Sequence, residues 1–475
     1  MGSVRTLVPR ARAVAAGILL SAMVCLPALA VPASTIDPAS NTPHLRDDGH
    51  ISLAWLYGGS SADYRAQIEA MPGLTTISPT WWYLDEDDPG GLEIGTDDEL
   101  VAWAQARGLA VWPLFGNHID PDLTDQVLRD PVLRQRVVDG IVAEVRRSGV
   151  DGVNVDFENL HDDTRFLLTD LVRELEVALP EVVVSVDVTA MTDTWVLGNW
   201  STAFDREGLG RVADYVMLMS YDQHNSLRRD GPVAGLQWVS ESTEFLLRTV
   251  PAEKLVLGLP LYSRHWATDA SARDGISLEA TLGMAAMANR VAERSQAVTY
   301  DPVAGQDLHT WTDEQGRPNR VWLEDVASLQ RKTELVDLHG LAGIAAWRAG
   351  FEQPEVWTAL DAQLAAMAPP GSTAPAAPTE TPTAVPDPST ADMPAEDGPV
   401  ADGPAVEEGA VPAGSTPSTG APTAAATEGS EPMDATATSA TAGGDMVTLA
   451  AATLLGVVGV AHTVRWRFSR RARDR

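Results

Sequence analysis

Polar and apolar side chains alternate along the stretch 151–158, Asp-Gly-Val-Asn-Val-Asp-Phe-Glu, from residue 153 onward. Successive side chains of a β-strand point to opposite faces, so Asn154, Asp156 and Glu158 share one face. Two carboxyl groups on one face resist simultaneous ionisation, which raises the pKa of at least one of them. A carboxyl group that keeps its proton near neutral pH can donate it, so this strand predicts acid–base chemistry.

The elements that would position this strand follow from the apolar pattern of the chain. Short apolar runs predict eight strands, at 51–57, 74–82, 109–115, 152–158, 182–189, 215–221, 255–261 and 341–347. Amphipathic segments between them predict helices, including 97–107, 132–147, 162–179, 238–249 and 324–338. Eight strand–helix units predict a (β/α)8 TIM barrel, in which the active site lies at the carboxyl ends of the strands.

In such a barrel the apolar residues Val153, Val155 and Phe157 must face the surrounding helices. The polar face of the fourth strand then lies inside the barrel and points toward its catalytic mouth. Burying two carboxylates costs several kcal/mol unless they are paired or functional, so an acidic strand with a purely structural role is disfavoured. The interval 263–321 is too long for one connection and predicts an insertion between strands seven and eight that forms one wall of the cleft. A separate domain there is the alternative.

The same stretch resembles the Asp-Gly-x-Asp-x-Asp-x-Glu signature of family 18 glycosidases, with Asn154 in place of the second Asp. Three further stretches agree with this resemblance in their order along the chain: Met-Leu-Met-Ser-Tyr-Asp at 217–222, Gly-Leu-Pro-Leu-Tyr at 258–262 and Ala-Ala-Trp at 345–347. The resemblance covers essentially the whole predicted barrel. It is nearest in character to bacterial cell-wall and spore glucosaminidases, although the sequence shows no wall-binding repeat module.

The resemblance implies catalytic roles for the residues that match. Glu158 would protonate the leaving glycosidic oxygen and later activate water, and the substrate's own acetamido oxygen would attack the anomeric carbon. Asp156 would orient that acetamido group, and the hydroxyl of Tyr221 would hold its oxygen. The expected outcome of this substrate-assisted mechanism is retention of the anomeric configuration. Asn154 is the departure, because an amide cannot share a proton with Asp156. We expect this to alter the pH dependence of the reaction rather than to abolish activity.

The resemblance also implies contacts with the sugar. Trp347 would form the apolar floor under the reacting ring, with ordinary core packing as the alternative. The further candidates for substrate binding are Asp222, Met219, Tyr57, Trp82 and Tyr262, each weighed against plain packing. His118 and Asp187 could also face the mouth, but a lone histidine or aspartate is more often structural, so neither is predicted to act.

No cofactor or metal is expected, because the nine histidines show no ligand spacing and no glycine-rich phosphate loop occurs. The formal charge of −32 makes nucleic acid and anionic lipid unsuitable partners for the exported part. We expect a polysaccharide substrate and a monomeric protein.

The ends of the chain predict export and membrane attachment. Residues 1–30 combine arginines, an apolar run and a small-residue cleavage pattern, as in a secretory signal peptide; a first membrane span would need a longer run. The barrel is predicted at 44–367 and is followed at 369–445 by a disordered stalk of Pro, Ala, Thr, Ser, Gly and acidic residues. Residues 446–464 predict a transmembrane helix, and the basic tail 465–475 would be cytoplasmic. This predicts a single-pass protein of the cell membrane with an extracytoplasmic catalytic domain.

Two alternative anchors are disfavoured. Cys25, the only cysteine, lies within the signal peptide and lacks the small preceding residue of a lipidated cysteine. The stretch 416–420 is only a faint match to a sortase site.

The leading hypothesis is therefore a membrane-anchored glycosidase that cleaves β-linked polymers containing N-acetylglucosamine, such as peptidoglycan or chitin-like chains. A carbohydrate-binding pseudoenzyme on the same barrel is the main rival, but such proteins typically lose the acid, and Glu158 is present. A non-catalytic interaction protein would need the stalk to be its working part.

Overall fold

A computed structural model of the chain describes residues 45–46, 48–194, 198–225, 229–272 and 275–372. The predicted signal peptide, stalk, transmembrane helix and basic tail lie outside these residues. Within the described ranges, no helix combines the length and the apolar character that crossing a membrane requires.

Parallel strands close into a barrel in the order β1-β15-β9-β8-β7-β6-β5-β2, and β1 also pairs with β2. The barrel strands are β1 (Ile51–Leu56), β2 (Thr76–Leu84), β4 (Ala110–Val111) followed by β5 (Leu114–Gly116), β6 (Gly152–Asp156), β7 (Val183–Thr189), β8 (Tyr215–Met219), β9 (Leu255–Pro260) and β15 (Gly343–Trp347). A short strand, β3 (Leu92–Ile94), pairs antiparallel with the outer end of β2. The prediction of a (β/α)8 barrel is confirmed.

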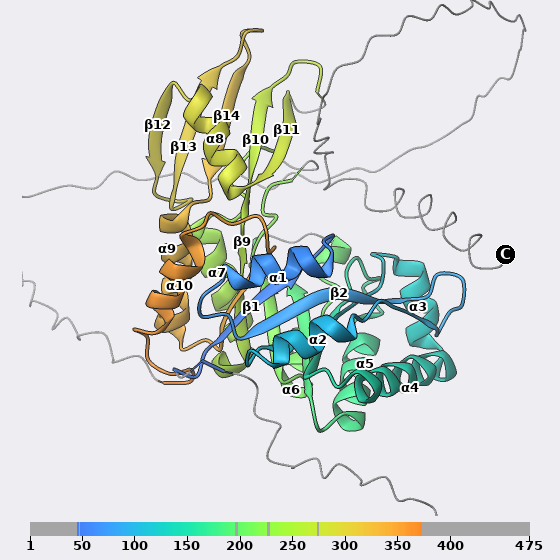
Figure 1. The fold of residues 1–475 in the computed structure, drawn as a ribbon. Helices are drawn as coiled ribbons and strands as arrows, with labels where there is room; N and C mark the ends of the chain where they lie inside the picture. Colours follow the sequence, from blue (N-terminus) through green and yellow to red (C-terminus); the bar gives the residue numbers. More distant parts are fainter. Residues whose placement is uncertain (1–44, 47, 195–197, 226–228, 273–274, 373–475) are drawn as a thin grey trace, which may run out of the picture. The chain divides into compact units, whose positions relative to one another are not determined.

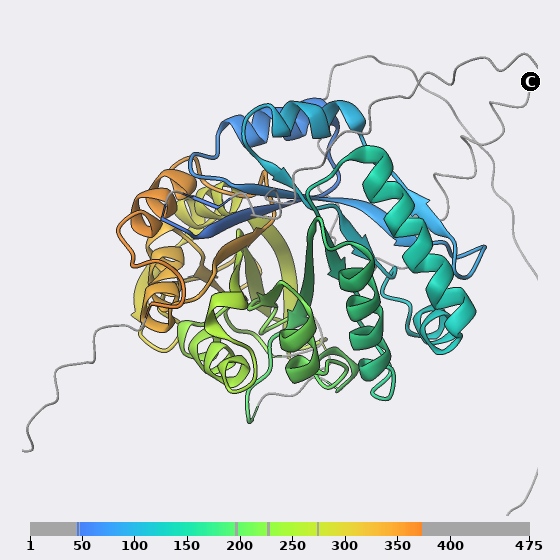
Figure 2. The ribbon, with the colours of Figure 1, turned by 90° about the horizontal axis from the view of Figure 1, so that it is seen from below.

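Helices surround the strands, as Figure 2 shows. They are α1 (Ser61–Glu69), α2 (Asp98–Gln105), α3 (Pro121–Arg129), α4 (Pro131–Ser148), α5 (Arg165–Ala178), α6 (Arg206–Val212), α7 (Leu236–Leu247), α9 (Val326–His339) and α10 (Val356–Leu364), with short 3-10 turns at Gly198–Trp200 and Ala252–Lys254. Their ends follow from local chemistry. In α4, for example, Asp130 accepts the amide of Val132 at 2.8 Å, and the helix ends at Gly149 with a φ of 67°.

The third barrel strand, predicted as one strand at 109–115, consists of two short strands, β4 and β5. Pro113 interrupts it, since proline has no N–H to donate to a ladder. The chain still pairs on both sides: Trp112 N donates to Ile77 O at 2.9 Å, and Asn154 N donates to Pro113 O at 3.0 Å. The barrel wall is therefore continuous across the break.

Two apolar layers separate the inside of the barrel from its outside. The larger layer packs the outer faces of the strands against the helices and includes Val153, Val155 and Phe157. The smaller layer fills the barrel interior: Ile51, Leu53, Trp55, Ala110, Trp112, Leu114, Val183, Met217, Val256, Ala342 and Ala345. The polar face of β6 thus points inward, as the alternation of side chains predicted.

The predicted insertion is an antiparallel sheet with one helix, and it lies between β9 and β15 in the chain (Figure 1). Its strands pair in the order β11-β10-β14-β13-β12. Its elements are β10 (Tyr262–Thr268), β11 (Ile276–Gly283), α8 (Met284–Arg294), β12 (Ala297–Asp301), β13 (Gln306–Thr312) and β14 (Pro318–Leu323). The amide of Met284 donates to Leu261 O at 3.1 Å and to Phe351 O at 2.7 Å, which ties the start of α8 to the barrel.

Candidate active site

Asp156 and Glu158 lie at the carboxyl end of β6, where the barrel opens. Asp156 is the last residue of the strand, and Glu158 follows it on the same face. Phe157 between them is fully buried in the outer layer, which anchors this segment. Both residues are partly exposed as a whole, although one Asp156 carboxylate oxygen is buried. The strand thus presents two acids at the mouth while its apolar residues pack outward.

Asn154 lies one step below these acids and is fully buried, so its side chain does not reach the mouth. Its Oδ1 accepts from Trp55 Nε1 at 2.8 Å and from Ser78 Oγ at 3.2 Å. Its Nδ2 donates to Ser185 Oγ at 3.1 Å and to Asp187 Oδ1 at 2.7 Å. These four bonds use the whole capacity of the amide and fix its orientation. Asn154 therefore supports the site from beneath.

The surroundings of the acids favour their protonated forms. Burial raises the pKa of Glu158 well above its usual value, and the negative charges of Asp156 and Asp222 raise it further. Burial raises the pKa of Asp156 to about 7. One Asp156 oxygen, Oδ1, is buried and has no hydrogen-bond partner among the described residues. The site thus offers a protonated glutamic acid beside an aspartate with a free acceptor.

Tyr221 follows β8 and its phenol faces the same acids. Burial raises the pKa of Tyr221 well above its usual value, and the charges of Asp187, Asp156 and Glu158 raise it too. The hydroxyl group therefore stays protonated at neutral pH and can donate a hydrogen bond. The ring lies 6.5 Å from that of Tyr262 at 69°, in an edge-on arrangement.

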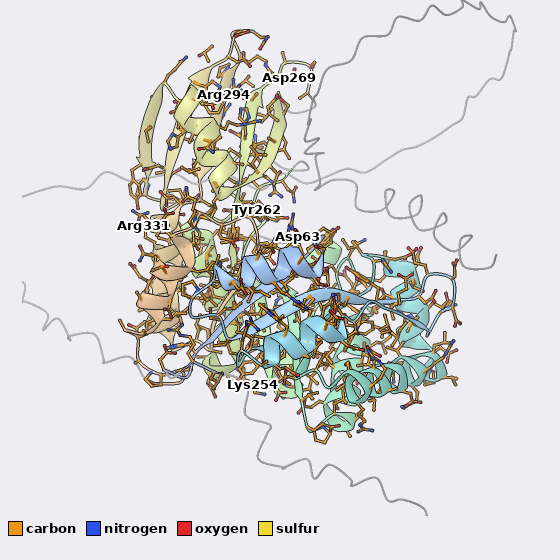
Figure 3. All side chains as sticks on the ribbon, in the orientation of Figure 1. Asp63, Lys254, Tyr262, Asp269, Arg294 and Arg331 are labelled. Carbon is orange, nitrogen blue, oxygen red and sulfur yellow. The ribbon has the colours of Figure 1, made fainter. Side chains whose placement is uncertain are left out.

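Asp222, the next residue, is held by two donors from the first strand of the insertion. The hydroxyl of Tyr262 donates to its Oδ1, and Arg264 Nη2 lies 2.7 Å from the same oxygen. Arg264 is only 1% exposed, so its charge is largely withdrawn from water. Figure 3 shows Tyr262 where β9 passes into β10, at the opposite end of β9 from Lys254. Arg264 is not among the residues predicted from the sequence, although its spacing of two residues from Tyr262 places both side chains on one face of a strand.

Aromatic rings gather at the ends of β1 and β15. The ring of Trp347 lies 6.2 Å from that of Trp55 and 6.0 Å from that of Tyr57. Trp347 packs against the interior layer but stays partly exposed. Met219 ends β8 and is 8% exposed. Trp347 and Tyr57 can therefore offer ring surface to a ligand at the mouth.

Trp82 does not face the cleft, so the prediction for this residue is wrong. It is fully buried in the outer layer, and its Nε1 donates to Thr96 Oγ1 at 2.8 Å. The register between β2 and β5 shifts between Thr80 and Trp82, which marks an irregularity of the β-bulge type. A bulge inserts one residue and reverses the faces of the side chains beyond it. Strict alternation from the start of β2 therefore cannot predict them.

Tyr83 takes the inward place beyond this irregularity. A Cβ added to Gly116 would lie 2.8 Å from Cε1 of Tyr83, so only glycine allows the ring to lie so close to β5. The ring stacks on His118 at 4.4 Å and 22°. Burial raises the pKa of Tyr83, and the charge of Asp156 adds to the effect. Tyr83 is thus a site residue that was not predicted from the sequence.

Asn117, after β5, holds the main chain of the acid. Its Oδ1 accepts the amide of Glu158 at 3.0 Å, and its Nδ2 donates to the carbonyl oxygen of Glu158 at 2.9 Å. The same Nδ2 donates to Thr124 Oγ1 at 2.8 Å. The side chain is 1% exposed and so continues the β5–β6 pairing one step past the strands.

The insertion also reaches the loop that follows Asp222. Arg320 Nη1 lies 2.8 Å from Asp230 Oδ2, and Trp266 Nε1 donates to Gly231 O at 2.9 Å. A hollow of about 180 Å³ remains between this loop and the end of β12, lined in part by Gln223 and Trp322.

The described part of the chain holds no group of three or more His, Cys, Asp or Glu side chains that could bind a metal ion.

The family follows from comparison with known proteins. The sequence model described as "Glycosyl hydrolases family 18" matches residues 85–352, more than half of the chain. The chain belongs to this family. It is therefore a glycoside hydrolase, and the resemblance on which the sequence analysis relied is confirmed.

Comparison with individual proteins agrees with this assignment. The chain is 32% identical over 229 residues to the "Putative sporulation-specific glycosylase YdhD" of Bacillus subtilis (strain 168), which covers 48% of this chain and 53% of that protein. The chain thus spans about half the length of that relative. It is 29% identical over 307 residues to the cortical fragment-lytic enzyme of the same organism, covering 63% and 70% of the two chains.

A solved structure supports the fold. The chitinase from Chromobacterium violaceum ATCC 12472 superposes with a TM-score of 0.60 and 22% identity, covering 66% of this chain and 99% of that one. At this level of identity the likeness shows a shared fold and nothing more.

Proposed function

We propose that this family 18 glycoside hydrolase cleaves β-linked polymers that contain N-acetylglucosamine, peptidoglycan or chitin-like chains, with retention of configuration. The observation that carries the proposal is the pair at the mouth of the barrel. Glu158, whose pKa is raised by burial, lies beside Asp156, one oxygen of which has no hydrogen-bond partner among the described residues. The names of a cortical fragment-lytic relative and of a chitinase with the same fold support a polymer of this class.

In the first step, Glu158 gives its proton to the glycosidic oxygen as the bond to the anomeric carbon breaks. The acetamido oxygen of the same sugar forms the new bond to that carbon, as in substrate-assisted family 18 enzymes. Asp156 accepts the acetamido N–H as a carboxylate, and the hydroxyl of Tyr221 donates to the acetamido oxygen. The two contacts hold the nucleophile in line with the carbon.

In the second step, Glu158 is a carboxylate and takes a proton from water as the water oxygen attacks the anomeric carbon. The acetamido group is released, and Glu158 recovers its proton. Two displacements at one carbon restore the starting configuration. Trp347 packs under the ring, while Asp222, held by Tyr262 and Arg264, accepts a sugar hydroxyl or amide beside the cleavage point.

We further propose that the barrel works outside the cytoplasmic membrane. The predicted signal peptide at 1–30 and the apolar segment at 446–464, followed by arginines, support a single-pass anchor. The acidic, proline-rich stretch at 369–445 would then separate the barrel from the membrane.

The test compares the full-length protein with Glu158→Gln, using chito-oligosaccharides and purified peptidoglycan. We expect the wild type to release reducing ends and the variant to lose at least about a hundredfold of this activity, since it lacks the acid. Glu253→Gln is the matched control, because Glu253 is exposed in the 3-10 turn that precedes β9. Equal release by wild type and Glu158→Gln would refute the assignment. Binding of the glycan by a wild type that does not cleave it would favour the carbohydrate-binding alternative.

A further inference from the structure

Asp187, on β7, is a buried carboxyl group without a cation. It is 2% exposed, and no ion pair joins it to any residue of the described ranges. Within the described ranges its side chain accepts one hydrogen bond, from Asn154 Nδ2 at 2.7 Å. An ionised carboxylate in such a place would have a single neutral donor to offset its loss of water, which is unfavourable. The group is therefore most stable with a proton.

The strand register places Asp187 beside Asp156. β6 and β7 pair in parallel with Asn154 opposite Ser185 and Val155 opposite Val186, so the next residues along the two strands are Asp156 and Asp187. Both belong to the inward-facing set, because Val155 and Val186 pack in the outer layer. Two acid side chains thus lie on neighbouring strands, at the same height and on the same face.

The fixed amide of Asn154 orients Asp187. Oδ1 of Asn154 accepts from Trp55 on β1 and from Ser78 on β2, so its Nδ2 must point the opposite way, toward β7. Asp187 Oδ1 receives that N–H, so Oδ2 is the oxygen that can carry a proton. Asp156 Oδ1, in turn, is buried and has no donor among the described residues. One proton would satisfy both groups.

We propose that Asp187 is a positioning residue that shares one proton with Asp156 across the β6–β7 pair. When the proton lies on Asp187, Asp156 is a carboxylate and can receive the substrate's acetamido N–H. When the proton lies on Asp156, Asp187 carries the negative charge. In both states the pair holds one proton and one negative charge. This inference rests on the proposed function only in giving Asp156 its orienting role.

The groups that face Asp187 agree with this reading. From β6, the charges of Asp156 and Glu158 raise its pKa, burial being the larger cause, while the bond from Asn154 opposes them. From the end of β8, Tyr221 faces it, and the charge of Asp187 helps to keep that phenol protonated. No lysine, arginine or histidine of the described residues pairs with it. Although the amide of Asn154 cannot share a proton with Asp156, the neighbouring strand supplies a carboxyl group that can.

The first test is the pH profile of kcat/KM for Asp187→Asn. An amide at this position can accept from Asn154 and donate permanently to Asp156, which favours the ionised form of Asp156. We expect the acid limb of the profile to move to lower pH by about one unit. Asn154→Asp alone adds a third carboxyl group and should move the limb to higher pH. The double variant Asn154→Asp/Asp187→Asn returns the number of carboxyl groups to that of the wild type and should bring the limb back.

Ser185→Ala is the matched control. It removes the other acceptor of Asn154 Nδ2 without changing any charge, so we expect its acid limb to coincide with that of the wild type whatever happens to the rate. An unchanged limb in Asp187→Asn would overturn the proposal. An equal shift of the acid limb in Ser185→Ala would also overturn it, because the effect would then come from the orientation of Asn154. So would an acid limb that stays displaced in the double variant.

A second measurement needs no activity and no variant. In the wild type labelled with carbon-13 at aspartate carboxyl groups, the Asp156 signal should titrate in two steps, because its proton affinity depends on the state of Asp187. A single step with an ordinary midpoint would overturn the sharing of a proton. If the wild type cleaves no glycan, the proposed function fails, and this titration still decides whether the two acids are coupled.

Discussion

Replacing Asp156 by asparagine should stabilise the folded protein above neutral pH while it abolishes activity. Burial raises the pKa of Asp156 from 3.8 to about 7. A group with a raised folded-state pKa holds its proton more tightly when folded, so it opposes folding once that proton must be lost. The penalty is absent below pH 3.8, grows as the pH rises toward 7, and is complete above it.

The magnitude follows from the size of this displacement. About three pH units correspond to roughly 4 kcal/mol at most, since one unit is worth about 1.4 kcal/mol. Asp156 keeps some contact with water and interacts with Asp187, so we expect about 2 kcal/mol of the free energy of unfolding to be regained. Asparagine has nearly the same shape and cannot ionise, and it therefore removes the penalty without opening a cavity.

The assay is urea unfolding of the wild type and Asp156→Asn at several pH values between 4 and 8. The two stabilities should be similar at pH 4 and should diverge in favour of the variant above pH 7. Glu253→Gln, at an exposed position, should follow the wild type at every pH. A variant that is equally or less stable than the wild type at pH 8 would refute the reasoning, because the carboxylate would then be well satisfied in the folded state.

Two further predictions concern the core and the cleft. Lys332 Nζ lies 2.9 Å from Glu324 Oε2, and both side chains are at most 1% exposed, so Lys332→Met should cost about 3–5 kcal/mol of unfolding free energy. Most of this should return in Lys332→Met/Glu324→Gln; an equally unstable double variant would contradict the ion-pair explanation. Trp347→Ala should lower kcat/KM by about tenfold or more through loss of ring contact. Trp82→Phe should leave kcat/KM within about twofold while costing about 1 kcal/mol of stability, and a larger kinetic effect in Trp82→Phe would contradict its placement in the outer layer.

The alternation of side chains in β6 could be read from the sequence, because a regular strand has a strict period of two. It placed Asn154, Asp156 and Glu158 inside the barrel and Val153, Val155 and Phe157 outside. The same rule failed for Trp82, since the irregularity in β2 depends on pairing with β5. Periodicity is a local property, whereas a bulge is defined by two strands together.

We could predict from the sequence the family, the eight-strand barrel and the position of the acids on its fourth strand, because these follow from a local motif and from repeated apolar runs. Only the tertiary structure brought Arg264 to Asp222 and Asp187 to Asn154. The two pairs join residues that are 42 and 33 positions apart in the sequence and that lie on different segments of the fold, so their meeting depends on register and closure of the barrel. Asp156 and Glu158 could be identified from the sequence alone. The carboxyl group that shares a proton with Asp156 comes from the neighbouring strand β7, so it could be assigned only from the strand register.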